Sequence, residues 1–353
     1  MANEMYRIGI VGAASLVGKE LSDALGESLL AASDVVLLDE EEAAGQMTAT
    51  GDEVAFIQRL EPSAFERVDF VFFAGDAATT KKHWQDARRA GASIVDLTYA
   101  LEGKKDVLVR SPWVAEALGP LGTKTRKGKE PDLNTHAVVA AHPAAVMIAL
   151  AAARLSGQMP LTGVAATVME PASEHGRAAM DELHQQTVNL LSFQSLPREQ
   201  YDAQIAFNLL PGLGGAAAVK LKAAGEHIQE QYAALAGGAL PALALQMAQA
   251  PVFHGYVVSL LVEFGGLVAL EQVERALAGE HIDVVSGESD PPSNLSAMGQ
   301  EDVMVRVSKA GGEDGPETRF WLWMAADNLK LAALNAIACA SELGRLRPLG
   351  KVQ

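Results

Sequence analysis

The chain has 353 residues, enough for about two domains with sizeable hydrophobic cores. Hydrophobic residues make up 49% of it and charged residues 20%, which is typical of a well-packed globular protein. Its formal net charge of −16, with a pI near 4.9, argues against nucleic acid and anionic membrane surfaces as partners.

The N-terminal part of the chain alternates strand-like and helical patterns. Runs of β-branched and aromatic residues predict strands at 6–13, 34–40, 68–75, 92–98 and 135–141, and periodic patterns predict helices at 16–28 and 79–91. This alternation predicts an α/β domain with a doubly wound parallel sheet. The Gly-, Pro- and Lys-rich stretch 118–134 has no periodicity and is expected to be a surface loop.

The pattern changes after residue 145. Longer strands are predicted at 163–173, 250–264, 303–309 and 319–327, with helices at 176–192 and 227–237. This favours a second, α+β domain with an antiparallel or mixed sheet. A final amphipathic helix, 328–345, is expected to return to the first domain. It contains the only cysteine, Cys339, which is expected to be a buried structural thiol.

A glycine-rich stretch, GIVGAASLVGKEL, leads from the first predicted strand into the first predicted helix. Its pattern places Gly9, Gly12, Ser15 and Gly18 at the positions of a dinucleotide-binding turn, with Ser15 where a further glycine is expected. Such a turn lets the backbone approach a pyrophosphate at the N-terminus of a helix. The sequence therefore predicts a cofactor-binding ancestry.

The second predicted strand ends in the acidic sequence LLDEEEAAGQ. A carboxylate at this point, Asp39, can accept a hydrogen bond from the adenosine ribose 2′-hydroxyl and repels a 2′-phosphate. Residues 39–42 are all acidic, so NAD is favoured over NADP if a dinucleotide binds. The alternative is a solvated acidic turn without a ligand.

The stretch VVAAHPAAVMIALAAARL, residues 138–155, is predicted to form a strand, a His-Pro turn and a helix. Many α/β enzymes place a nucleophile at such a turn. Here the helix opens with Ala144 and Ala145, which have no reactive groups.

Several stretches, taken in order, resemble the aspartate-semialdehyde dehydrogenase family. They are GIVGAASLVGKEL, DFVFFAGDAATT, GASIVDLT, THAVVAAHPAA, GRAAMDELHQQTVNLL, AFNLLP, APVFHGYVVSLLVEF and ADNLKLAALNAIACASEL. They extend over nearly the whole chain. The EPASEHG stretch resembles the usg-type bacterial paralogues, which depart from the enzymes in a similar way.

The resemblance implies a Rossmann-type domain of residues 1–143 plus 327–353 and a central α+β dimerisation domain of residues 144–326. It also implies a homodimer that forms through the central domain. In the family, a cysteine thioester forms during NADP-dependent reductive dephosphorylation of aspartyl phosphate. A histidine moves protons, a glutamine holds the acyl group and arginines bind carboxylate and phosphate.

At each position that has a catalytic role in the family, the resemblance places a residue that cannot perform that role in this chain. The position of the nucleophilic cysteine holds Ala145, the glutamine position holds Glu170, the arginine position Gln249 and the histidine position Tyr256. Without a nucleophile no thioester forms, and such a loss costs several orders of magnitude in rate.

The binding roles are changed as well. The phosphate-binding arginine of the family falls near Glu102, and the arginine that contacts the cofactor 2′-phosphate falls near Glu42. A carboxylate repels both phosphates. The sequence therefore predicts a catalytically degenerate homodimer that acts in ligand binding or regulation, with no intact catalytic residue and no metal site.

Two alternatives remain open. The chain could be an active semialdehyde dehydrogenase of amino-acid biosynthesis that uses other residues. It could instead carry recruited acid–base chemistry at His254, Tyr256 and Glu170, with His142 and His175 near them, or bind a metal there. His254 and Tyr256 lie two residues apart on a segment expected to be extended, so their side chains should point the same way.

A cytoplasmic location is expected. The N-terminus lacks the basic and apolar regions of a signal peptide. The most apolar windows, 137–153 and 233–250, are interrupted by His-Pro, Gly-Gly and Pro and fall short of a membrane span.

Overall fold

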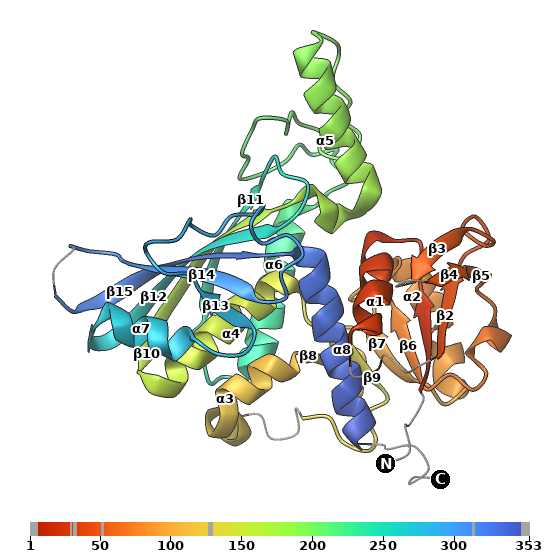
Figure 1. Ribbon diagram of the computed structural model, residues 1–353, viewed down its shortest axis with the longest axis horizontal. Coiled ribbons are helices and arrows are strands. Elements are labelled where there is room, and N and C mark those ends of the chain that lie inside the picture. Colours follow the sequence, from red (N-terminus) through yellow and green to blue (C-terminus); the bar gives the residue numbers. More distant parts are fainter. Residues whose placement is uncertain are drawn as a thin grey trace. The chain divides into compact units, whose positions relative to one another are not determined.

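The computed structural model describes residues 6–28, 30, 34–50, 53–125, 130–312 and 315–346 (Figure 1). The chain forms two compact units. The first comprises residues 1–113, 127–142 and 332–353, and the second comprises residues 114–126 and 143–331. None of the helices among the described residues has the length and apolarity needed to cross a bilayer.

The first unit is built on a seven-stranded sheet in which every paired neighbour is parallel, with the strand order β5-β2-β1-β6-β7-β9-β8. Its strands are β1 (Arg7–Val11), β2 (Asp34–Asp39), β5 (Gln58–Arg59), β6 (Phe70–Phe73), β7 (Ser93–Asp96), β8 (Val107–Arg110) and β9 (Ala137–Ala140). The central strands β6, β7 and β9 are buried along their whole length, as expected for strands covered on both faces. The predicted doubly wound parallel sheet is confirmed.

Helices α1 (Leu16–Gly26) and α2 (Ala77–Arg89) follow β1 and β6, and a small hairpin is formed by β3 (Met47–Thr50) and β4 (Glu53–Phe56). A short 3₁₀ helix, η1 (Pro62–Phe65), precedes β6. The last helix, α8 (Asn328–Leu346), belongs to the first unit from residue 332 onward. Its buried side chains share a core with β1 and α1, which confirms that the terminal helix returns to the first domain. Cys339 is completely buried in this core.

The second unit contains a six-stranded mixed sheet with the order β11-β10-β12-β15-β14-β13. Its strands are β10 (Leu161–Glu170), β11 (Leu243–Gln249), β12 (Tyr256–Val268), β13 (Ile282–Val284), β14 (Val303–Lys309) and β15 (Glu317–Ala326). The pairs β10–β12, β12–β15 and β14–β15 are antiparallel, and β10–β11 and β13–β14 are parallel. The predicted second α+β domain is confirmed.

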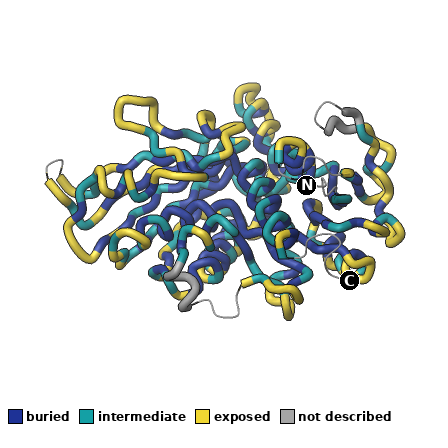
Figure 2. Tube along the Cα trace, turned by 60° about the horizontal axis from the view of Figure 1, so that its bottom comes forward, coloured by how far each residue is buried: buried dark blue, intermediate teal, exposed yellow. Residues whose placement is uncertain are grey.

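Helices cover one face of this mixed sheet. Helix α4 (Pro143–Gln158) packs against β10 and β12, α6 (Leu221–Ala236) against β11, and α7 (Leu270–Leu277) against β14. Along much of β12 and β15 buried residues alternate with more exposed ones, as expected when successive side chains point to the helix-covered face and to the opposite face. Figure 2 shows how buried and exposed residues are distributed along the chain. On the opposite face, Trp321 and Trp323 are 41% and 37% exposed, and Trp321 pairs with Leu261 across the strands.

Helix α5 (Gly176–Leu191) follows β10 through the 3₁₀ turn η2 (Ala172–His175) and projects from the sheet (Figure 1). The helix buries three polar side chains, which hold the loop that follows it. Glu182 accepts hydrogen bonds from the backbone of Gln200 and Tyr201, Gln186 contacts Pro197, Ala203, Ile205 and Ala206, and Asn189 donates to Ser195.

One sequence prediction is wrong in part. The stretch 118–134 was expected to be a loop, but α3 (Pro112–Thr125) extends through its first half, with a kink at Gly119, where φ is +47°. Glycine tolerates this left-handed backbone, so the glycine and proline signals mark a bend inside a helix. Residues 126–129 of the predicted loop lie outside the described part of the chain.

Candidate functional site

The turn between β9 and α4 holds the predicted position of the nucleophile. Pro143 opens α4, as its fixed φ angle allows at a helix start. Ala144 and Ala145 follow and are completely buried, so the only side-chain groups that these two residues contribute to the helix start are methyl groups. His142, the last residue of the first unit at this turn, is buried, with its ring 5.7 Å from that of Tyr99.

Glu170 ends β10 and has a completely buried carboxylate. Its Oε2 lies 2.8 Å from Nε2 of His175, and its Oε1 accepts a hydrogen bond of 3.4 Å from the Tyr256 hydroxyl. The intervening 3₁₀ turn η2 brings His175 back over the end of the strand. The structure therefore joins three of the predicted site residues into one cluster, which we call the Glu170 cluster (Glu170, His175 and Tyr256).

Opposing effects act on the imidazole of this cluster. Burial lowers the pKa of His175, but the hydrogen bond that its ring donates to Glu170 and the charges of Glu170 and Glu174 outweigh it, so the pKa of His175 is raised. Nearby, burial and the charges of Glu170 and Glu182 raise the pKa of the Tyr201 hydroxyl. The imidazole of His175 therefore keeps its proton to a higher pH than an unperturbed histidine does.

Gln249, at the predicted arginine position, ends β11 beside Glu170 in the parallel register. Its Nε2 donates to the backbone oxygens of Glu170 at 2.9 Å and Ala250 at 3.3 Å, and the side chain is completely buried. Its Oε1 has no hydrogen-bond partner among the described residues. The amide is therefore fixed to the backbone and cannot replace an arginine that binds a carboxylate.

The expected alignment of His254 with Tyr256 is wrong. Gly255 between them has a φ of +87°, so the chain is not extended there, and β12 begins only at Tyr256. Tyr256 is completely buried, whereas His254 is half-buried and its backbone oxygen accepts from Asn294. Among the described residues, His254 makes no hydrogen bond to a member of the Glu170 cluster.

The predicted cofactor residues lie together at the end of β1. Gly12 has a φ of +84°, and a Cβ there would lie 2.2 Å from the Cα of Gly75; a Cβ at Gly18 would lie 2.2 Å from the oxygen of Gly12. Both positions therefore require glycine, because the turn packs closely against the backbone of Gly75 and against the start of α1. Gly9 lies within β1, where a Cβ would make only ordinary contacts.

Ser15 caps α1. Its Oγ accepts from the backbone N–H of Gly18 at 2.8 Å and donates to the oxygen of Ala74 at 2.7 Å, which ties this turn to the end of β6. Asp39, at the end of β2, accepts from the backbone N–H groups of Ala14 and Glu40, each at 2.9 Å. The glycine turn and the acidic turn are thus directly connected.

The two remaining acidic positions lie in the first unit. Glu42 is exposed, and Glu102 is half-buried in the turn that follows β7. No group of three or more His, Cys, Asp or Glu side chains in the described part of the chain is arranged to hold a metal ion.

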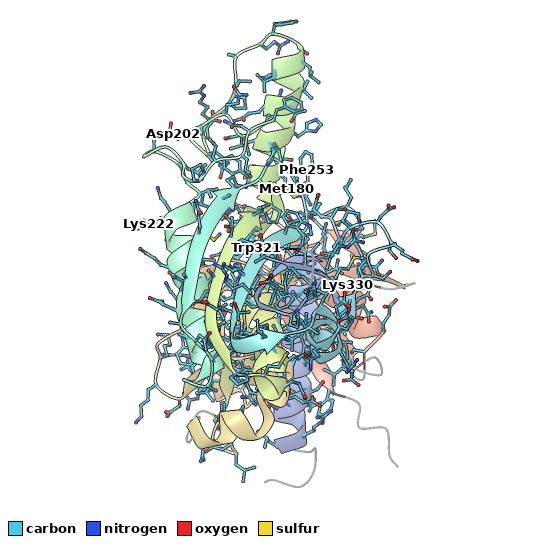
Figure 3. The ribbon with its side chains drawn as sticks, turned by 90° about the vertical axis from the view of Figure 1, so that its left-hand side faces the viewer. Met180, Asp202, Lys222, Phe253, Trp321 and Lys330 are labelled. Atoms are coloured by element: carbon cyan, nitrogen blue, oxygen red, sulfur yellow. The ribbon has the colours of Figure 1, made fainter. Side chains whose placement is uncertain are left out.

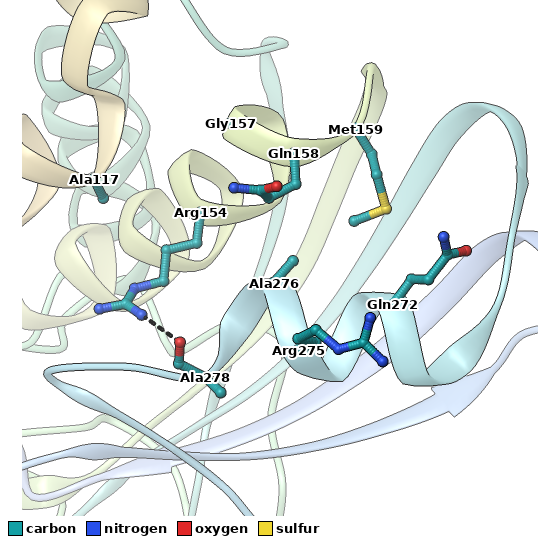
Figure 4. Close-up of a pocket in the computed structure, with 9 residues that line it drawn as sticks. All are labelled: Ala117, Arg154, Gly157, Gln158, Met159, Gln272, Arg275, Ala276 and Ala278. Atoms are coloured by element: carbon teal, nitrogen blue, oxygen red, sulfur yellow. Dashed lines mark hydrogen bonds between the residues drawn. The ribbon is translucent and has the colours of Figure 1, made fainter.

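A separate hollow of about 600 Å³ lies between the end of α4 and helix α7 (Figure 4). Arg154 reaches into it and donates to the backbone oxygens of Leu277, Ala278 and Glu280. Because its guanidinium holds the end of α7, we assign Arg154 a structural role. The hollow contains no member of the Glu170 cluster.

Sequence reasoning missed one contact in the first unit. Thr79, in the first turn of α2, places its Oγ1 3.2 Å from Oε1 of Glu40 and 2.7 Å from Oδ2 of Asp76. The signal was present as the helix-capping sequence Asp76-Ala-Ala-Thr79. Its partner Glu40 lies thirty-nine positions earlier in the chain, and no local sequence pattern connects the two residues.

Two family models match the chain. Residues 7–119 match the family model of the semialdehyde dehydrogenase NAD-binding domain, and residues 153–331 match the model of the semialdehyde dehydrogenase dimerisation domain.

Relatives cover nearly the whole chain. A USG-1 protein homolog from Pseudomonas aeruginosa is 32% identical over 95% of this chain and 96% of its own length, and an aspartate-semialdehyde dehydrogenase from Rickettsia bellii is 25% identical over 96% and 97%. The solved structure of a probable aspartate-semialdehyde dehydrogenase from P. aeruginosa has a TM-score of 0.82 and 29% identity, covering 97% of this chain and 98% of that one.

Proposed function

Because the chain belongs to the semialdehyde dehydrogenase family, we propose that it is a homodimer that binds a dinucleotide and has lost the phosphorylating dehydrogenase reaction. The observation that carries this proposal is the absence of a usable thiol. Ala145 stands at the nucleophile position, and Cys339 is the only cysteine of the sequence. We propose that it acts by binding or regulation instead.

Cys339 is a poor nucleophile for physical reasons. It is completely buried in the core of the first unit, and its Sγ lies 3.6 Å from the backbone oxygen of Arg110. Burial, with the charge of Glu342, raises the pKa of this thiol, and the charge of Arg110 only partly opposes the shift. A buried neutral thiol does not attack an acyl group.

The proton carrier and the acyl-holding group have also been replaced. At their positions stand Tyr256 and Glu170. The Tyr256 hydroxyl donates a hydrogen bond to Glu170, and Glu170 is also paired with His175. These side chains use their hydrogen-bonding groups on one another in the protein interior. This supports a site that is filled by its own side chains and not one that is open to a substrate.

The family NAD-binding domain supports dinucleotide binding, and we propose NAD as the favoured form. Gly12, Ser15 and Gly18 shape the turn before α1, and Asp39 lies beside it. The helix start suits a pyrophosphate, and the acidic turn that begins at Asp39 disfavours a 2′-phosphate.

We propose that the homodimer forms through the open face of the mixed sheet. Helices cover only the other face, and Trp321, Trp323 and Leu261 lie on the open one (Trp321 is labelled in Figure 3). A sheet face that exposes two tryptophans is typical of a surface that another chain covers.

The decisive experiment is an enzymatic assay of the purified protein with aspartate semialdehyde, phosphate and NAD or NADP. An aspartate-semialdehyde dehydrogenase with its cysteine intact serves as the positive control. We expect no NADH or NADPH production above background. Robust production would overturn the proposed loss and favour the active-dehydrogenase alternative.

The 2.8 Å contact between His175 and Glu170 favours one second candidate, acid–base catalysis on a different substrate. Such an enzyme would need the pair to reach the substrate, and the His175 side chain is 20% exposed whereas that of Glu170 is inaccessible. A screen of isomerisation and elimination substrates with wild type and His175→Gln tests this candidate. A turnover that the substitution abolishes, with the fold retained, would support it.

A further inference from the structure

The mixed sheet of the second unit ends in an edge strand that lacks the usual protection against pairing. Strand β11 is the outermost strand of this sheet and has β10 as its only neighbour in it. Edge strands usually carry a lysine, a proline or a β-bulge, which keeps other chains from pairing with them. The sequence of β11, LALQMAQ, has no charge and no proline, and its register with β10 is unbroken over all seven residues. This edge is therefore open to a further strand.

The hydrogen bonds at the end of β11 show which of its backbone groups point away from β10. The N–H of Ala250 donates to β10, so the groups of Gln249 point the other way, where both of them pair with Leu210. Backbone groups alternate along a strand, so those of Leu245 and Met247 point to the open side as well. Within the described part of the chain, no backbone group pairs with these outward N–H and C=O groups. Two donors and two acceptors are thus available in a row.

A hollow of about 890 Å³ lies alongside these unpaired groups. Residues 245–247 of β11 form one wall, and the start of α6 and the glycine-rich loop 211–215 form the others. Gly225 lets α6 lie close to the strand, since a Cβ there would lie 2.7 Å from Cγ of Met247. The helix and the loop therefore leave a groove beside the open edge.

The side chains around this groove are mainly apolar, and its charged groups are engaged. Lys222, labelled in Figure 3, lies 3.6 Å from Glu226 on the next turn of α6, and Lys220 donates to the backbone oxygen of Ala217. A ligand is therefore selected by its backbone and its apolar groups and not by its charge. The apolar side chains that line the groove are those of Leu213, Val219, Leu221, Leu245 and Met247.

We propose that β11 binds an extended, uncharged segment of a partner protein, which adds to the mixed sheet as a further strand. The chain itself shows this mode of pairing, because Leu210 pairs with Gln249 in the antiparallel manner at one end of the edge. The incoming strand continues that pairing past Met247 and Leu245, and alternate side chains of the segment enter the groove. A second copy of the chain fits less well, because its own Leu210 holds the place beside Gln249 and shortens the edge that two β11 strands could share.

The test is a titration of a fluorescein-labelled hexapeptide of alternating valine and threonine with the full-length protein, followed by fluorescence anisotropy. Such a peptide favours an extended backbone and has no charged side chain. Leu245→Pro removes one outward N–H, and proline is tolerated there because no bond to β10 is lost. Leu245→Ala is the matched control, since it shortens the same side chain but keeps the N–H. We expect the proline variant to weaken binding by about tenfold or more and the alanine variant by less than about threefold.

Hydrogen exchange of the wild-type protein gives a second readout that requires no substitution. In the free protein the N–H groups of Leu245 and Met247 should exchange faster than those of Gln246 and Ala248, which point to β10. Saturating peptide should slow the exchange of the first pair and leave that of the second pair unchanged. The same peptide N-methylated at every residue has no backbone donors and should neither bind nor slow the exchange.

Three outcomes would overturn the proposal. One is the absence of both peptide binding and added protection in the wild-type protein. Another is equal weakening by the two Leu245 variants together with protection spread evenly along β11, which would mean that the open edge is not the contact. If Leu245→Pro lowers the mass of the assembly in sedimentation without peptide, the edge binds a second copy of the chain and the partner segment is refuted.

Discussion

The Glu170 cluster gives the sharpest physical prediction, for the substitution Glu170→Gln. The change keeps the size of the side chain and restores the residue type that the family resemblance expects there. It removes the charge from a 2.8 Å contact with His175 at a completely buried position. A hydrogen bond to a charged group contributes about 1.5–3 kcal/mol, and a glutamine amide keeps part of it. We expect a loss of about 1–2 kcal/mol in the free energy of unfolding at pH 6.

The pH dependence follows from the raised pKa of His175. A histidine whose pKa is higher in the folded state contributes stability that is fully present below its unfolded value, near 6.5, and is lost as the pH rises through the folded value. The charged groups around this imidazole are Glu170 and Glu174. The advantage of wild type over Glu170→Gln should therefore shrink between pH 6 and pH 9.

The assay is urea unfolding at several pH values and one protomer concentration, because dimerisation couples stability to concentration. The control is Glu263→Gln, an exposed carboxylate on β12 that faces the other end of β10. NMR titration of the His175 ring should show its pKa fall in Glu170→Gln. A stability difference that grows with pH, or an unchanged His175 pKa, would refute the ion pair.

Three further predictions concern other parts of the molecule. Ala145→Cys alone should give no semialdehyde turnover, because the proton carrier and substrate clamps are also replaced; measurable turnover in the semialdehyde assay would contradict the proposed degeneracy. Trp321→Glu should raise the dissociation constant of the dimer by about tenfold or more in analytical ultracentrifugation. Met47→Ser, which changes an exposed apolar side chain of the first unit, should leave it unchanged. Equal effects would exclude the open sheet face as the dimer interface. Gly12→Ala should abolish NAD binding in calorimetry and cost roughly 2 kcal/mol or more of stability, since its Cβ would lie 2.2 Å from Gly75; retained binding would show that the turn is not the cofactor site.

The parallel sheet was predictable because its strands are continuous apolar runs. Phe70–Phe73 and Ala137–Ala140 are buried at every residue, and their short length with aromatic or β-branched residues favours strands over buried helices. Strand β11 was missed, because LALQMAQ lies in an Ala-rich stretch where strand and helix patterns look alike. Strand β8 (Val107–Arg110) was also missed, because its apolar run is only three residues long before Arg110 and those three residues are only partly buried.

The candidate site was predictable residue by residue but not as an arrangement. The sequence could show that Ala145 lacks a nucleophile, because that depends on residue type alone. It could not show that Gly255 adopts a left-handed φ and separates His254 from Tyr256. Contacts such as that of Glu40 with Thr79 depend on which strands become neighbours, which no local pattern encodes.

The contacts of the buried Glu170 side chain bear on how this site evolved. An unpaired carboxylate in a protein interior costs several kcal/mol, so replacing a neutral glutamine by glutamate at a buried position is destabilising on its own. His175, five positions later, supplies the compensating charge, and Tyr256 supplies a second hydrogen bond from the position where the family has its proton carrier. Under the proposed assignment of these positions to the family's catalytic roles, the two replacements therefore stabilise each other. If catalysis was lost as proposed, selection for a stable fold alone would retain this mutual dependence. A double substitution of Glu170→Gln with His175→Gln should cost less stability than the sum of the single changes, as a double-mutant cycle would measure.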